Sequence, residues 1–139
     1  MSELHISRTF DAPVDRVWAA FTGADALAAW FWPERLVPQA TVDVRVGGQF
    51  RIAATAAGFA VSGTYQEVVP PTRLVMTWRW DGEDEDSLVT IDLTACGDAT
   101  DVELRHERLA SDESRDQHAQ GWHDCLGRLP DWLAASVQL

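Results

Sequence analysis

Hydrophobic and polar residues change their spacing along the chain, and each spacing predicts a different element. Residues 4–10 (LHISRTF) alternate between apolar and polar side chains, which predicts a half-buried β-strand. Residues 11–23 change to helical spacing after Pro13, with one apolar stripe formed by Val14, Val17, Trp18 and Phe21. Gly23 ends this helix, and residues 24–30 predict a short second helix.

From residue 35 to about residue 108 the pattern is that of short strands separated by turn residues. Glycine or proline marks the breaks, for example Gly47-Gly48 and Pro70-Pro71. The connections are short, so consecutive strands are expected to pair antiparallel. In residues 100–107 apolar and charged side chains alternate, which predicts a sheet with one dry face and one wet face. The predicted strands are ATVDVRV, QFRIAAT, FAVSGTYQEVV, RLVMTWRW, SLVTIDL and TDVELRHE.

The last predicted element is a long amphipathic helix over residues 111–137. Ser111 is a suitable N-cap, and the acidic residues after it favour the positive end of the helix dipole. Its apolar face consists of Trp122, Cys125, Leu126, Leu129 and Leu133. A helix and a sheet with one dry face each are expected to pack together, so the chain predicts a single α+β domain over residues 1–139. In this fold a curved antiparallel sheet surrounds the C-terminal helix, and two short helices follow the first strand.

The net charge of the chain argues against some classes of binding partner. The 22 acidic and 11 basic residues give a net charge of −11, which repels nucleic acid and anionic lipid surfaces. No apolar run is long enough for membrane insertion, and the first residues show no export signal. Cys96 and Cys125 do not form a CxxC pair, so free thiols in a cytoplasmic protein are expected.

Seven stretches of the sequence resemble a known family. They are FDAPVDRVWAAFT, WFWP, VDVRVGGQFR, GTYQEVVPPTRLVMTWRW, SLVTIDL, TDVELRHE and GWHDCLGRL. In this order they resemble the single-domain bacterial relatives of the heat-shock-protein-90 ATPase activator, the AHSA-like family of the START-like, SRPBCC superfamily. The resemblance implies a helix-grip fold with a cavity between sheet and C-terminal helix. It does not imply one function, because the superfamily includes lipid transfer, aromatic cyclisation, hormone binding and co-chaperone roles.

Three adjacent aromatic residues, Trp30, Phe31 and Trp32, precede Pro33 and fit neither helical nor strand spacing. In a helix-grip fold this segment lies where the sheet and the long helix separate. The rings could form the rim of the cavity, or they could plug the end of the core. Because three consecutive side chains are not expected to face one interior, at least one of them should remain partly exposed.

Two histidines are expected to point inward, His106 by strand alternation and His118 by helical phase. Such a pair could bind a polar ligand group or act as acid and base, although a single inward histidine is more often a hydrogen-bonded structural residue. His123 lies off the buried face and no acidic residue has ligand spacing, so no metal site is predicted. No serine elbow or activated cysteine is present, so no catalytic residue is assigned.

The candidate ligand-binding residues all belong to segments expected to face one cavity: Trp30, Trp32, Phe50, Trp78, Trp80, His106, His118 and Trp122. The first hypothesis is a binding protein for a small hydrophobic molecule, aromatic or lipid-like, without a cofactor. Two alternatives stay open, namely a cyclase-like or other enzyme acting on such a molecule, and a co-chaperone-like module with a protein partner. A homodimer is also possible.

Overall fold

Seven strands form one antiparallel sheet with the order β1-β7-β6-β5-β4-β3-β2. The computed structural model describes residues 2–136. The strands are β1 (Ser2–Phe10), β2 (Pro38–Val42), β3 (Gln49–Ala54), β4 (Phe59–Val69), β5 (Arg73–Trp80), β6 (Ser87–Cys96) and β7 (Ala99–Leu109). All neighbours from β2 to β7 are consecutive in the chain, so the meander predicted from the turn residues is confirmed. Only β1 joins the sheet out of sequence order, beside β7.

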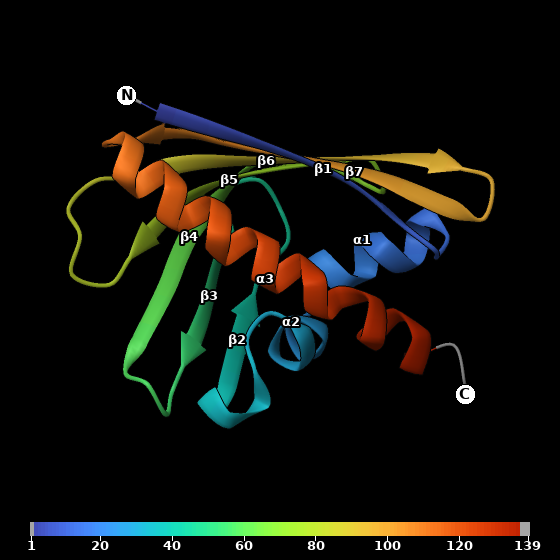
Figure 1. The fold of residues 1–139 in the computed structure, drawn as a ribbon, viewed down its shortest axis with the longest axis horizontal. Coiled ribbons are helices and arrows are strands. Elements are labelled where there is room, and N and C mark those ends of the chain that lie inside the picture. The colour runs from blue at the N-terminus through green and yellow to red at the C-terminus, as the bar shows by residue number, and fades with distance from the viewer. Residues whose placement is uncertain (1, 137–139) are drawn as a thin grey trace.

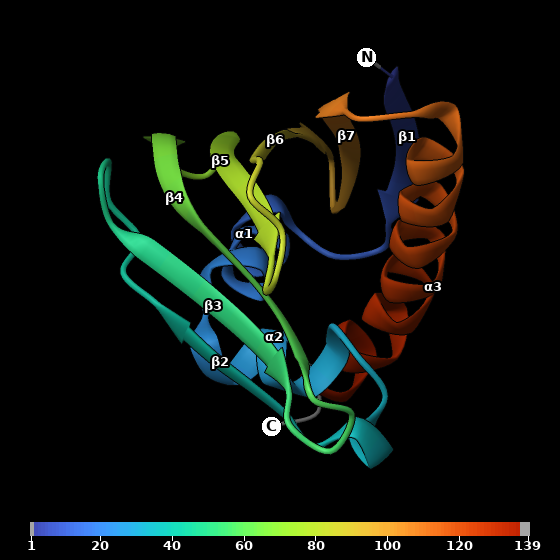
Figure 2. The ribbon, with the colours of Figure 1, turned by 90° about the vertical axis from the view of Figure 1, so that its left-hand side faces the viewer.

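The helices lie on the inner side of this sheet. α1 (Val14–Thr22), α2 (Ala24–Trp30) and the short 3-10 helix η1 (Glu34–Leu36) connect β1 to β2, and α3 (Asp112–Ser136) ends the described chain. Ser111 caps α3, since its Oγ accepts a hydrogen bond from the Ser114 amide at 3.0 Å. Figure 1 shows α3 crossing in front of the sheet, with α1 and α2 near its C-terminal half. Figure 2 shows the sheet curving from β2 round to β1, with α3 along its open side. The helix-grip α+β fold is therefore confirmed.

The alternation along the strands separates the two faces of the sheet as expected. In β7 the side chains of Val102, Leu104 and His106 are buried, whereas Glu103 and Arg105 between them are exposed. The sheet can bend because the pairing of β4 with β5 shifts register between Tyr65 and Glu67. These features direct the apolar side chains of β5 and β7 toward α3.

The aromatic segment of residues 30–32 corrects one expectation, because all three rings are buried. Trp30 is 1%, Phe31 4% and Trp32 9% exposed. The reason is that the interior surrounds this turn on several sides. Trp30 packs on Phe21 of α1 with ring centroids 5.4 Å apart. Phe31 meets Trp122 of α3, and Trp32 meets Phe59 of β4. Consecutive side chains that point in different directions therefore all enter the core.

No helix among residues 2–136 is long and apolar enough to cross a membrane.

Candidate ligand-binding pocket

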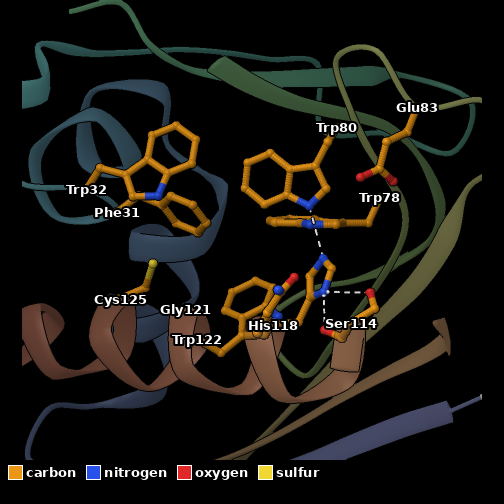
Figure 3. A pocket seen from close by; sticks show the side chains of 11 residues that line it. Phe31, Trp32, Trp78, Trp80, Glu83, Ser114, His118, Gly121, Trp122 and Cys125 are labelled. Atoms are coloured by element: carbon orange, nitrogen blue, oxygen red, sulfur yellow. Dashed lines mark hydrogen bonds between the residues drawn. The ribbon is translucent and has the colours of Figure 1, made fainter. Parts of the chain in front are cut away.

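A cavity of about 300 Å³ lies between α3, the aromatic segment after α2, and the end of β5 (Figure 3). This volume is at the lower end of the range for small-molecule sites. Five large aromatic rings form most of its wall, and the remaining side chains are small or polar. The lining residues are Phe31, Trp32, Trp78, Trp80, Glu83, Ser114, Gln117, His118, Gly121, Trp122 and Cys125. The cavity is therefore mainly apolar, with polar groups concentrated along α3 and at the β5–β6 hairpin.

One stripe of α3 forms the floor of the cavity. Ser114, His118, Gly121 and Cys125 follow each other at intervals of three or four residues, which places them on one helical face. Gly121 leaves space there, because a Cβ added to it would meet no atom within 4 Å. A glycine in a helix interior costs about 0.5–1 kcal/mol relative to alanine, so the open space at this position is obtained at the expense of helix stability.

His118 is held in one orientation by hydrogen bonds at both of its ring nitrogens. Its Nδ1 lies 2.7 Å from the Ser114 carbonyl oxygen, so Nδ1 carries the proton and donates it. Its Nε2 then accepts the hydrogen bond that the Trp80 Nε1–H donates at 3.0 Å. Dashed lines in Figure 3 mark these contacts. The bonds link α3 to the end of β5 across one side of the cavity, and both ring nitrogens are occupied by protein groups.

His106 has an analogous arrangement but lies deeper, with no exposed surface. Its Nδ1 accepts a hydrogen bond from the Trp122 Nε1–H at 3.0 Å, so its proton is on Nε2, which donates to Ser87 Oγ at 2.6 Å. Burial first, and the nearby His118 second, lower the pKa of His106 from 6.5 to about 3. His106 is therefore a neutral imidazole at physiological pH, and its hydrogen bonds fix the Trp122 ring in the cavity wall.

The structure brings five of the eight predicted site residues into the cavity wall: Trp32, Trp78, Trp80, His118 and Trp122. The other three lie outside this lining. Trp30 donates its Nε1–H to the Ala20 carbonyl oxygen at 2.9 Å and belongs to the core. Phe50 packs on Trp78, with ring centroids 5.7 Å apart, without lining the cavity. His106 contacts Trp78 and Trp122 rather than the cavity itself.

Sequence reasoning considered Phe31 only as part of the aromatic segment, and it did not select five of the lining residues: Glu83, Ser114, Gln117, Gly121 and Cys125. A usable signal existed on α3, because a mid-helix glycine one turn from His118 lowers helix stability and so indicates a packing or functional reason for its presence. No comparable signal existed for Glu83, which is one of several acidic residues in the β5–β6 hairpin.

Two further groups of the cavity wall are the Trp78 indole and the Cys125 thiol. The Trp78 side chain is 4% exposed, and its Nε1 has no hydrogen-bond partner in the part of the chain that the structure describes. A buried donor without a partner is unfavourable, and this nitrogen has almost no accessible surface, so it is covered by the surrounding protein. Burial raises the pKa of the Cys125 thiol to about 12, which makes it a poor nucleophile. Within residues 2–136 no group of three side chains is arranged to hold a metal ion.

Comparison with known proteins supports the fold and the family. The family described as "Activator of Hsp90 ATPase homolog 1-like protein" matches residues 11–134. The crystal structure of protein CV1439 from Chromobacterium violaceum is 29% identical, with a TM-score of 0.80 over 96% of this chain and 98% of that one. CalU16 from Micromonospora echinospora is 30% identical, with a TM-score of 0.76 over 97% of this chain and 78% of that one.

A more distant structure has the same fold. PFC0360w, an HSP90 activator from Plasmodium falciparum, is 22% identical, with a TM-score of 0.79 over 96% of this chain and 97% of that one. No curated protein matches the chain at a significant level.

Proposed function

The chain belongs to the Activator of Hsp90 ATPase homolog 1-like family, and from this premise we propose that it binds a small, mainly apolar and aromatic molecule in the cavity beside α3. The observation that carries the proposal is the composition of the wall. Five aromatic rings line an open space of about 300 Å³, although large apolar side chains normally pack together and leave little such space. Flat rings of a ligand would find stacking and edge-on partners on several sides.

The histidine and the thiol of the wall suit binding more than catalysis. An acid or base needs a nitrogen or oxygen free to exchange a proton with the substrate. Both nitrogens of His118 are hydrogen-bonded to Ser114 and Trp80, and the Cys125 thiol is held in its neutral form. In contrast, the aromatic rings of the wall offer flat apolar contact that needs no proton exchange.

Gly121 provides a direct way to test this proposal. Gly121 lines the cavity and a Cβ added to it would meet nothing within 4 Å, so Gly121→Leu adds a large side chain at the cavity wall. Gly127→Leu is the matched control, because Gly127 is also exposed on α3 but does not line the cavity. The two variants therefore make the same chemical change inside and outside the proposed site.

The experiment compares native mass spectra of freshly purified protein and isothermal titrations with 1-naphthylmethanol as a neutral aromatic probe. We expect the wild type and Gly127→Leu to carry a co-purified small molecule or to bind the probe. Gly121→Leu is expected to lose this binding by about tenfold or more while it stays folded. Equal behaviour of the two variants, or no binding by the wild type in either measurement, would overturn the proposal.

A further inference from the structure

We infer that the cavity selects a cationic aromatic molecule, with a protonated amine or a quaternary ammonium group, over neutral or anionic molecules of the same shape. This inference rests on the proposed function, because it assigns the ligand class of the same site. It follows from the rings that line the cavity, from the charges around it, and from how these charges are distributed along it.

The aromatic wall is the first part of the argument. Trp32, Trp78, Trp80 and Trp122 contribute four indole rings, and Phe31 contributes a fifth aromatic ring. The face of an aromatic ring carries partial negative charge, and indole attracts cations most strongly among the side chains. The rings stand at different angles, for example Trp78 and Trp80 at 86° with centroids 6.2 Å apart. A cation placed between such rings meets more than one negative face.

Charge is the second part, because within residues 2–136 the carboxylate of Glu83 is the only charged side chain that lines the cavity. Glu83 belongs to the hairpin between β5 and β6 and is drawn beside Trp80 in Figure 3. Two acids of this hairpin are paired, since Asp81 pairs with Arg51 and Asp86 pairs with Arg79. Asp84 and Glu85 add further negative charge without lining the cavity. Among the residues that the structure describes, no salt bridge neutralises Glu83, so its charge remains available to a ligand.

The cavity is polarised from one end to the other. Cys125 lies on the opposite side from Glu83 in Figure 3, and the Arg128 guanidinium approaches its Sγ at 3.5 Å. Arg128 does not line the cavity and is turned onto the main chain, donating to the Phe31 carbonyl oxygen at 2.6 Å. An ammonium group is therefore favoured at the Glu83 end, and the apolar part of the ligand at the Cys125 end. The net charge of −11 also raises the local concentration of cations around the whole protein.

The test uses three probes that share one ring system and differ in charge: 1-naphthylmethylamine, 1-naphthylmethanol and 1-naphthoate. Each is titrated calorimetrically into the wild type, Glu83→Gln and Glu85→Gln at pH 8, where the amine is protonated and ordinary imidazoles are neutral. Glu85 is exposed in the same hairpin and does not line the cavity, so its variant controls for the change in net charge.

We expect the wild type to bind the amine about tenfold more tightly than the alcohol, and the carboxylate most weakly, as one partly desolvated cation–π contact allows. Glu83→Gln should reduce the preference for the amine severalfold, and Glu85→Gln should leave it nearly unchanged. Unchanged far-ultraviolet circular dichroism confirms that both hairpin variants are folded.

Three outcomes would contradict the inference. Binding of the alcohol or the carboxylate as tightly as the amine would overturn the cation preference and leave the proposed binding function intact. An equal loss in both hairpin variants would show that the overall charge, and not Glu83, sets the preference. No binding of any probe would overturn the proposed function and the inference with it.

Discussion

His106 should make the stability of this protein unusually sensitive to mild acid. In the folded protein the ring is fully buried, and its Nδ1 accepts a hydrogen bond from Trp122. Protonation would place a second donor opposite the Trp122 N–H and a charge in the core. The pKa of His106 is therefore about 3 when folded and about 6.5 when the chain is unfolded.

The sign and size of the effect follow from these two values. Below pH 6.5 His106 binds a proton in the unfolded chain but not in the folded protein. The free energy of unfolding therefore decreases as pH falls from 6.5 toward 3. Each pH unit in this window costs about 1.4 kcal/mol. Between pH 7 and pH 4.5 the loss due to His106 alone amounts to about 2–3 kcal/mol.

Guanidinium unfolding followed by tryptophan fluorescence can isolate this contribution. The wild type and His106→Gln contain the same carboxylates, which contribute equally to the pH dependence of both proteins. Their contribution therefore drops out of the difference in unfolding free energy between the two. This difference should change by about 2–3 kcal/mol from pH 7 to pH 4.5, in favour of the variant at low pH. The control His123→Gln alters an exposed histidine on α3 and should follow the wild-type curve. A pH-independent difference for His106→Gln would refute the reasoning.

Three further expectations concern stability and reactivity. Gly63→Ala should destabilise the protein by about 2–3 kcal/mol in the same unfolding assay, because a Cβ there would lie 1.9 Å from the Thr77 carbonyl oxygen. Iodoacetamide at pH 8 should add one group per folded molecule, at the exposed Cys96, because the buried Cys125 reacts only in denaturant. Two rapid additions to the folded protein would contradict the burial of Cys125. Arg128→Met should lower the free energy of unfolding by about 2 kcal/mol, because two main-chain carbonyls of the aromatic segment lose their charged donor; an unchanged melting temperature would show that this anchor is dispensable.

The fold was predictable because its signals are local. Alternation in residues 100–107 assigns the inner face of β7, and Ser111 marks the start of α3, as the structure confirms. The cavity wall was only partly predictable, since strand and helix phase show that Trp78 and Trp122 point inward but not how near they come to each other. The exact lining depends on packing between distant segments, and the burial of the aromatic segment shows the same limit.

Glu83 illustrates why the remaining site residues escaped prediction. It follows Trp80 in a run of acidic residues, and composition alone assigns that run to solvent. Only the folded hairpin places this carboxylate at the cavity, while Asp81 and Asp86 pair with arginines and Glu85 faces solvent. Which of several acidic residues in one hairpin lines a cavity is decided by the tertiary structure.

The indole N–H resonances of the seven tryptophans offer the most direct test of the proposed binding site. Four of these rings, Trp32, Trp78, Trp80 and Trp122, line the cavity, and a fifth, Trp30, packs on Phe31 of the cavity wall. Trp18 and Trp132 do not line the cavity and are the two reference resonances. In two-dimensional ¹H–¹⁵N spectra, addition of 1-naphthylmethylamine should shift the four cavity resonances, with Trp78 Nε1–H among them, and leave the two reference resonances in place. Unchanged cavity resonances at millimolar probe, or shifts confined to Trp18 and Trp132, would contradict ligand binding at this site.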